Sequence, residues 1–289
     1  MVFFSSCSNK KENKFNETTG DKEQKVKQSS GSGSLVNYDL ADSNPLKFEL
    51  SSQLTEISGI TFTPDNRLFA HGDEYADIFE LDPATGSIIK KFTLGSLLAV
   101  KGDFEDLAYA GDKFFLLESN GKLYEFNEGN NGEYISYKTH KTFLTSKYDV
   151  EGLCYDNETN SLLLACKESG SKELGKDKAV YSFSLDNLEL EEIPRFIIPF
   201  KDIKNNTAEG KFNPSGIARN PKSGTFYIIA ARGNTIVEIS KTGEILDQAD
   251  LPQNVHRQAE GIAFKNDGTL FISNESSGKT PIIIVYSQK

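Results

Sequence analysis

The sequence has no long apolar run and no excess of basic residues. Its hydrophobic stretches are far shorter than the roughly 20 residues that a membrane-spanning helix needs, so no transmembrane segment is expected. The 32 Lys and Arg residues are outnumbered by 42 Asp and Glu residues, and the net charge is −10. Because a surface that binds nucleic acid needs a basic field, this charge argues against a nucleic-acid partner. It is compatible with cation binding or with solubility alone.

Familiar catalytic motifs are missing as well. The 289 residues contain no G-x-S-x-G elbow, no phosphate-binding loop and no G-x-G-x-x-G turn. The three histidines, His71, His140 and His256, lack zinc-ligand spacing such as H-x-x-E-H. A histidine in the core or on the surface is the default interpretation of each.

Cysteine is also scarce, and the three that occur are no disulfide framework. Cys154 and Cys166 lie in two neighbouring strand-like runs, and a turn near residues 156–160 would pair Cys154 with Leu163. We therefore interpret both as buried thiols that pack as small apolar residues. A disulfide between them is the less favoured alternative, because its geometry is narrow.

The third cysteine, Cys7, stands in a different context. The start reads MVFFSSCSNKKENK, in which an apolar fragment ends in Ser-Ser-Cys and turns polar. This is similar to the lipobox of a bacterial lipoprotein, although six preceding residues are too few for a complete signal peptide. We interpret residues 1–7 as the end of a longer signal and Cys7 as the lipidated residue. Residues 8–44 are rich in Lys, Glu, Asn, Ser and Gly and predict a flexible tether.

From about residue 45 the sequence changes to short strands. Runs such as RLFAH, KLYEF, TFYIIAA and IIIVYS are rich in β-branched and aromatic residues, and Gly, Asn, Asp or Pro bound them. No segment of helical length shows a period of 3.6 residues. Residues 45–289 are therefore predicted to be all-β.

These strands belong to an internal repeat. Five segments open alike, as in EISGI, DFEDLAY, DVEGLCYD, NPSGIA and QAEGIAF, and their openings are 47, 46, 64 and 45 residues apart. Each opening is followed by a strand, a turn and further strands. Four strands per unit and a period near 45 are typical of β-propeller blades.

The repeat predicts a five-bladed propeller of four-stranded blades, with blades starting near residues 58, 105, 151, 215 and 260. The last copy ends without a fourth strand, so the run at 46–52 is expected to complete it and close the ring. The longer third unit is expected to carry insertions near 169–178 and 201–211. A two-sheet sandwich is the structural alternative, but it does not explain the regular repeat.

In a propeller, equivalent positions of the innermost strands converge around one axis. The first row at the mouth is therefore Ser58, Glu105, Glu151, Ser215 and Glu260. Three carboxylates close together must take up protons at raised pKa, find a basic partner or bind a cation. Ca²⁺ suits such a site because it accepts six to eight oxygen ligands in loose geometry.

A second row comes from the ends of the second strands. Antiparallel pairing returns these ends to the mouth, so the acids there are expected beside those of the first row. The row consists of Asp73, Glu118, Glu168, Arg232 and Glu275. Arg232 is either the counter-ion of an acid or the anchor of an anionic ligand, for which Ser58 and Ser215 are further candidates. The competing structural interpretation is that each acid-glycine pair forms a bulge or turn.

The phrases ISGI, DFEDLAY, DVEGLCYD, NPSGIARNPKSGTFYI and QAEGIAF carry a resemblance that covers roughly residues 55–289. In this order they resemble the SdiA-regulated family of bacterial propeller proteins, distant relatives of NHL-repeat and phytase-like propellers. The resemblance implies a five-bladed propeller with a bound calcium ion, but no reaction. It transfers the ion site to Glu105, Glu151 and Glu260. Asp106 departs from the family pattern, because it replaces the glycine of the repeat.

The first functional hypothesis is a monomeric, calcium-binding propeller in the bacterial cell envelope. A lipid anchor would hold it to the membrane, and it would bind a small molecule or a protein. The second is a calcium-dependent lactonase or phosphoesterase, in which the ion would activate water. A protein-binding platform with an incidental ion is the third.

Overall fold

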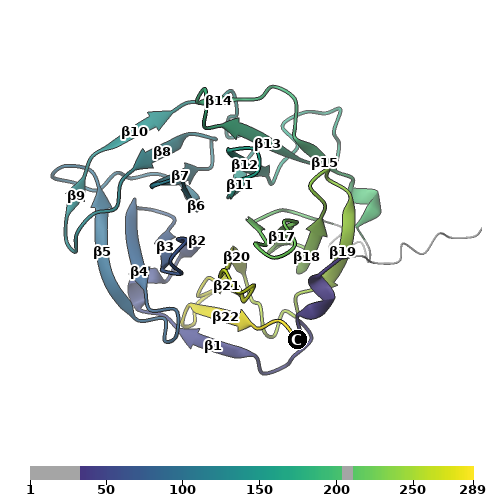
Figure 1. Ribbon diagram of the computed structural model, residues 1–289, viewed down its shortest axis with the longest axis horizontal. Helices are drawn as coiled ribbons and strands as arrows, with labels where there is room; N and C mark the ends of the chain where they lie inside the picture. The colour runs from purple at the N-terminus through teal and green to yellow at the C-terminus, as the bar shows by residue number, and fades with distance from the viewer. Residues whose placement is uncertain (1–32, 204–210) are drawn as a thin grey trace, which may run out of the picture. The chain divides into compact units, whose positions relative to one another are not determined.

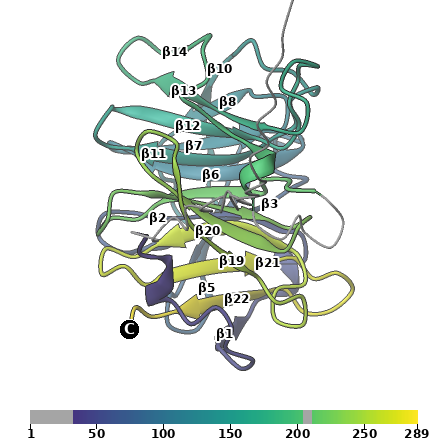
Figure 2. The same cartoon turned by 90° about the vertical axis from the view of Figure 1, so that its right-hand side faces the viewer.

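The computed structural model describes residues 33–203 and 211–289, which form a five-bladed β-propeller (Figure 1). Five small sheets stand around a central axis, and Figure 2 views the ring from its edge. The helical elements of this part are three 3₁₀ turns, η1 (Leu35–Asn37), η2 (Ser52–Leu54) and η3 (Phe200–Asp202). No helix among the described residues is long and apolar enough to span a membrane. The prediction of an all-β, five-bladed propeller is confirmed.

The first two blades follow the predicted order from the axis outward. Blade 1 consists of β2 (Ile57–Phe62), β3 (Leu68–Gly72), β4 (Asp77–Leu81) and β5 (Ile88–Leu94). Blade 2 consists of β6 (Phe104–Ala110), β7 (Lys113–Glu118), β8 (Leu123–Phe126) and β10 (Tyr137–His140). The short β9 (Tyr134–Ile135) pairs in parallel with β5 and so joins the sheet of blade 1.

The next two blades differ in their outer strands. Blade 3 consists of β11 (Val150–Asp156), β12 (Ser161–Cys166) and β13 (Lys178–Ser184), with β14 (Glu189–Leu190) and β15 (Phe196–Ile198) both paired to β13. Blade 4 consists of β16 (Gly216–Arg219), β17 (Phe226–Ala230), β18 (Thr235–Ile239) and β19 (Ile245–Asp250). The loop before β13 lies where the insertion near 169–178 was expected, whereas most of the insertion expected near 201–211 lies outside the described residues.

Blade 5 joins the two ends of the fold. It consists of β20 (Ala259–Phe264), β21 (Leu270–Asn274), β22 (Ile282–Tyr286) and, as its outermost strand, β1 (Leu46–Glu49). β1 pairs antiparallel with β22, with Leu46 opposite Val285 and Phe48 opposite Ile283. The expected closure of the ring by the strand near residue 46 is confirmed.

One residue in a left-handed backbone conformation marks the turn between the first two strands of every blade. These residues are Asn66, Gly111, Asn160, Gly224 and Gly268, all with positive φ. Glycine adopts this conformation without strain, and asparagine tolerates it better than most residues do. The recurring Gly and Asn of the repeat are therefore required by tight hairpins.

Apolar side chains fill the space between neighbouring blades in five clusters. The cluster between blades 1 and 2, for example, contains Phe69 and Phe114, whose ring centroids are 4.7 Å apart. Equivalent clusters lie at the other four contacts between blades. The burial of these side chains is the main favourable contribution to the fold, and it holds the inner strands around the axis.

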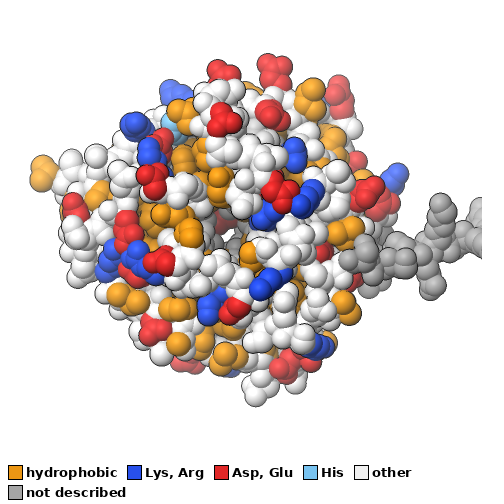
Figure 3. All heavy atoms as spheres, in the orientation of Figure 1, with side chains coloured by type: hydrophobic (Ala, Val, Ile, Leu, Met, Phe, Trp, Pro, Cys, Tyr) orange, Lys and Arg blue, Asp and Glu red, His pale blue; other side chains and the backbone are white. Residues whose placement is uncertain are grey.

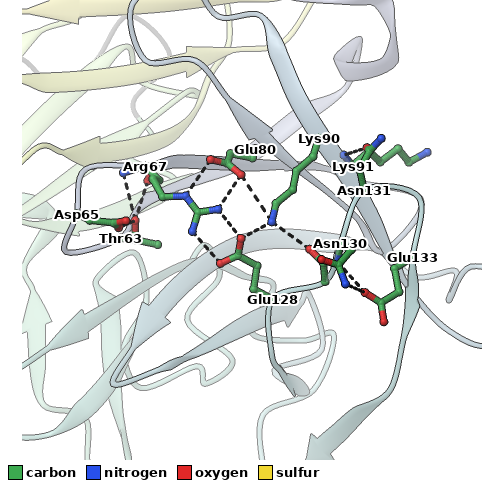
Figure 4. Close-up of polar contacts among 11 residues, drawn as sticks. Thr63, Asp65, Arg67, Glu80, Lys90, Lys91, Glu128, Asn130, Asn131 and Glu133 are labelled. Carbon is green, nitrogen blue, oxygen red and sulfur yellow. Dashed lines mark hydrogen bonds and ion pairs between the residues drawn. The ribbon is translucent and has the colours of Figure 1, made fainter.

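An ion network adds polar contacts between blades 1 and 2 (Figure 4). Arg67 donates to Glu80 at 2.9 and 2.7 Å, and to Glu128 of the neighbouring blade at 2.9 Å. Lys90 also pairs with Glu128. The planar guanidinium therefore bridges two carboxylates that belong to different blades.

The residues just before β1 pack on the propeller. Leu35, Tyr38 and Leu40 are buried in the cluster between blades 4 and 5. The carboxylate of Glu238, which is fully buried, accepts hydrogen bonds from the backbone N–H of Leu35 (2.7 Å) and the hydroxyl of Ser34 (2.9 Å). These residues belong to the folded domain, whereas the sequence placed them at the end of the tether. The lipidation candidate Cys7 and the tether before residue 33 lie outside the described residues.

The two cysteines of blade 3 are free and buried. Cys154 pairs with Leu163 in the ladder of β11 and β12, as the turn predicted. Burial raises the pKa of the Cys166 thiol to about 12. A thiol with a raised pKa is a poor nucleophile, so both side chains serve packing.

Candidate functional site

The five innermost strands begin at one mouth of the central channel, here called the upper mouth, and end at the lower mouth. A cavity of about 290 Å³ opens at the upper mouth between blades 3, 4 and 5. Of the first predicted row, Glu151, Ser215 and Glu260 line it. Of the second predicted row, Arg232 lines it. The repeat therefore brings residues from three blades to one place.

Close contact between the inner strands explains the glycine that follows the row-one residue in four of the five blades. A Cβ atom at Gly261 would lie 2.5 Å from the carbonyl oxygen of Ser58, and one at Gly216 would lie 2.7 Å from that of Glu260. The ladder of β20 and β21 also shifts register between Ala259 and Ile262. The structural interpretation thus holds for the glycines, which permit close packing at a bulge. It does not account for the acids beside them.

Asp106 occupies the glycine position of blade 2 and is fully buried. Its carboxylate accepts hydrogen bonds from the backbone N–H groups of Leu107 (2.8 Å) and of Leu153 in the next blade (2.6 Å). Burial raises the pKa of this carboxyl well above its usual range. The departure from the repeat therefore keeps the blade geometry and links blades 2 and 3.

The pKa values of the three row-one glutamates are all raised, and burial is the main cause of each shift. The pKa of Glu105 rises to about 9, because burial and the charge of Glu151 both disfavour its ionised form. The pKa of Glu151 rises to about 8, although Lys167 opposes the shift. The pKa of Glu260 rises to about 7, with Glu275 adding to the shift. Protonation, the first of the three expected responses to crowding, is therefore favoured.

A basic partner is also present. Lys167 forms an ion pair with Glu151 and lies 3.4 Å from the carboxylate of Asp149. Lys167 was not among the predicted site residues, because the next residue, Glu168, was expected at the mouth. In the ladder of β11 and β12, Val150 pairs with Cys166. The residue that follows Cys166 is Lys167, so knowledge of this pair would have identified Lys167 as the neighbour of Glu151.

The acids of the second row have separate surroundings. Asp73 lies near Glu56 and Glu275, and its pKa rises to about 6, mainly through burial. Glu118 accepts hydrogen bonds from Lys122 (2.6 Å) and the Tyr124 hydroxyl (2.7 Å), which turn it toward its own blade.

Glu168 lines a neighbouring cavity of about 200 Å³. Lys178 and Arg232 line the same cavity, so Arg232 faces both this space and the upper mouth. Burial lowers the pKa of Lys178, whose ammonium donates to the carbonyl of Lys167. The second row is therefore not one cluster of carboxylates.

Two arginines give the upper mouth its basic side. Arg232 and Arg257 line the cavity, and neither side chain has a hydrogen bond or ion pair with another described residue. Asn213, Asn234, Gln253 and Gln258 add amide groups. With Lys167, the wall carries three cationic side chains against two glutamates with raised pKa, an arrangement that favours an anionic ligand.

Two of the three histidines lie in the core. The Nε2 atom of His71 accepts a hydrogen bond from Gly59 N–H (3.1 Å), and that of His256 lies 2.8 Å from the Tyr286 hydroxyl. His140 lies on β10, the outer strand of blade 2, and contacts Glu125 of the neighbouring strand β8. Among residues 33–203 and 211–289, no group of three or more His, Cys, Asp or Glu side chains is close enough to hold a metal ion.

Comparison with known proteins identifies the family and the fold. The family model described as SdiA-regulated matches residues 46–278. Glutaminyl cyclase from Myxococcus xanthus is 14% identical, with 84% of this chain and 95% of that chain covered, at a TM-score of 0.55. The PQQ-bound aldose sugar dehydrogenase from Streptomyces coelicolor is 14% identical, with 86% and 99% covered, at a TM-score of 0.53.

A luciferin-regenerating enzyme is 12% identical, with 84% of this chain and 95% of that chain covered, at a TM-score of 0.52. At these identities the three likenesses show the propeller fold alone. No curated protein matches the sequence.

Proposed function

The chain belongs to the SdiA-regulated family, and we propose that its propeller is a binding module that takes a small anionic ligand at the upper mouth. The observation that carries this proposal is the pair of arginines, Arg232 and Arg257, which line the cavity without a protein partner among the described residues. A guanidinium binds carboxylate and phosphate groups in a bidentate manner. The amide side chains around it provide donors and acceptors for the rest of a polar ligand.

The charge balance of the cavity supports an anion over a neutral ligand. Glu151 and Glu260 are the two acids in the wall, and burial raises the pKa of both. Lys167 is paired with Glu151 and Asp149, so protonation of Glu260 leaves the positive charge of the two arginines in excess. An anion would restore neutrality in a partly buried site, where an uncompensated charge is costly.

The test is calorimetric titration with succinate and with inorganic phosphate, two anions that a guanidinium can bind. We expect one of them to bind saturably, and Arg232→Gln to weaken that binding about tenfold, which is the loss of about 1.4 kcal/mol. Arg195→Gln is the matched control, because Arg195 is exposed outside the cavity. Equal binding by the Arg232 and Arg195 variants would refute the proposal, and so would the absence of binding by both anions.

We propose a calcium ion as the second component of the upper mouth, for which Glu105, Glu151 and Glu260 are the candidate carboxylate ligands. These three glutamates offer oxygen ligands, and burial is the main cause of their raised pKa values. Since no three acids among the described residues are within reach of one ion, amide oxygens such as that of Gln258 would complete the set. When bound, calcium would supply a fixed positive charge for an anionic ligand.

Thermal unfolding with added calcium or with a chelator tests the ion separately from the anion. We expect calcium to raise the melting temperature of the wild type, and Glu151→Gln to reduce this shift. Unchanged melting in calcium and chelator would remove the ion from the proposal. The anion titration would still stand by itself.

One observation favours a hydrolase as the second candidate. The pKa of Glu260, about 7, suits a general base that works near neutral pH. A screen of lactones, phosphoesters and aryl esters decides between the candidates. Turnover that Glu260→Gln abolishes in a folded protein would support the hydrolase, whereas no turnover on any class would exclude it for these substrates.

We further propose that a lipid on Cys7 anchors the module in the cell envelope of a bacterium, through the polar segment that follows. Metabolic labelling with an alkyne-tagged fatty acid tests this anchor. We expect label on the wild type and none on Cys7→Ser. Equal labelling of both proteins would refute the lipid attachment.

A further inference from the structure

The lower mouth of the channel contains a cavity of about 420 Å³, separate from the proposed anion site. We propose that this cavity is a second binding site, which takes a neutral small molecule with an apolar ring. Its volume lies in the range of small-molecule pockets. Figure 3 shows a hollow at the centre of this face, with hydrophobic side chains around it.

Two rows of the repeat build the wall. The inner row has one aliphatic residue from each blade, namely Ile60, Leu107, Leu153, Ile217 and Ile262. Two residues further along each inner strand, the outer row has Phe62, Tyr109, Tyr155, Arg219 and Phe264. Three of the five blades thus present a half-buried aromatic residue at the rim, around an aliphatic base, while Phe264 packs inside the cluster between blades 4 and 5.

The aromatic rings of the rim are held in place by contacts with their own blade or, for Phe62, with the neighbouring blade 5. The ring centroids of Phe62 and Phe271 are 5.0 Å apart, and those of Tyr109 and Phe114 are 4.8 Å apart. The hydroxyl of Tyr155 donates to Asn160 at 2.9 Å. Because these contacts fix the rings before a ligand arrives, stacking on them costs little ordering entropy.

The charges in the wall select a neutral ligand. Arg219 is the one charged side chain among the described residues of the lining, and it is already paired. Its Nη2 atom lies 2.5 Å from Glu158, and its Nε atom lies 3.3 Å from the buried carboxylate of Asp156. An anionic ligand would have to compete with both acids, whereas a neutral ring would not.

The repeat glycines lie between the two sites, at the level where neighbouring inner strands approach each other closely. There, a Cβ atom at Gly59 would lie 2.6 Å from the Cα of Asp106, and the Ser273 hydroxyl donates to the carbonyl of Ser58 at 2.9 Å. From this level the inner strands continue to the lower mouth. The anion site and the apolar site share no lining residue and lie toward opposite ends of the inner strands.

N-phenyl-1-naphthylamine, a neutral fluorophore whose emission rises in apolar sites, is the probe for this cavity. We expect the wild type to bind one probe molecule saturably. Its sulfonated analogue, 1-anilinonaphthalene-8-sulfonate, is expected to bind more weakly.

Two variants and one control locate the probe. Tyr155→Asp places a charge at the rim, and Thr61→Trp fills part of the cavity; each is expected to weaken probe binding about tenfold. Tyr134→Asp is the control, because Tyr134 is exposed outside the cavity. Cooperative melting verifies that each variant folds, and Thr61→Trp decides the test if Tyr155→Asp does not fold.

Several results would overturn the proposal. One is binding that does not saturate at one probe molecule per chain. A second is equal binding by the wild type and the folded cavity variants, and a third is equal loss in the Tyr134 control. Tighter binding of the sulfonate, lost in Arg219→Gln, would replace the neutral ligand with an anion.

Discussion

Asp106→Gly restores the glycine that the other four blades carry at this position, and we expect it to destabilise the protein. The carboxylate of Asp106 accepts the backbone N–H groups of Leu107 and Leu153 in a fully buried place. Glycine has no side chain with which to replace either bond. The substitution would therefore leave two buried donors without an acceptor and remove the link between blades 2 and 3.

The size of the effect follows from these two donors. A buried N–H without a partner costs about 1–3 kcal/mol, so two cost about 2–6 kcal/mol. Removing the buried carboxyl, whose pKa is raised, returns part of this free energy. We expect a net loss of about 2–4 kcal/mol, or roughly 4–16 °C in melting temperature for a domain of this size.

Thermal and urea unfolding followed by circular dichroism measure this change. Asp106→Asn is expected to lie between Asp106→Gly and the wild type, because its single carbonyl oxygen can satisfy one of the two donors. Asp112→Gly is the matched control, since Asp112 is exposed in the next turn. An Asp106→Gly protein that melts at or above the wild-type temperature would refute the role assigned to this carboxylate.

Three further predictions concern the pH profile, the docked segment and the ion network. The pKa of Glu151 is raised from 4.5 to about 8 and that of Glu260 from 4.5 to about 7. Between the ordinary and the raised pKa values, the folded state therefore binds more protons than the unfolded state does. Without ligands, the melting temperature should thus fall as pH rises from 5 to 8; a flat profile would contradict the raised pKa values. Glu238→Gln should loosen residues 34–40 and speed cleavage there by a protease, and an unchanged cleavage rate would argue against their docking through Glu238. Arg67→Ala should cost about 1 kcal/mol in 0.1 M salt and less in 1 M salt; a salt-independent loss in urea unfolding would indicate packing instead.

Much of the fold could be predicted because the same strand and turn pattern occurs in five copies of the repeat. Spacing and the turn residues predict the blades, and the missing fourth strand of the last copy predicts that the run near Leu46 closes the ring. The docking of Leu35, Tyr38 and Leu40 could not be predicted in this way. Three apolar residues in a polar segment form no strand or helix pattern, and their partners lie in blades 4 and 5.

The candidate site could be predicted in outline only. The first row converges because equivalent positions of a ring must converge. The second row depends on the pairing of each hairpin to within one residue, since neighbouring residues of a strand point in opposite directions. A bulge in the ladder after Val150 shifts that count, so Lys167 contacts Glu151 where Glu168 was expected. A bulge of this kind cannot be recognised from the sequence, because it is defined by the pairing of the two strands.

The pairing of β1 with β22 has a consequence for how the protein is made. β1 leaves the ribosome first among the strands, yet its partner is the last strand of the chain. Four blades can form during translation, while β1 must wait with an unpaired edge until β22 has been made. Closure of the ring thus joins distant parts of the chain, and such non-local pairing is slow. Until it occurs, the nascent protein exposes two strand edges that are prone to misassembly.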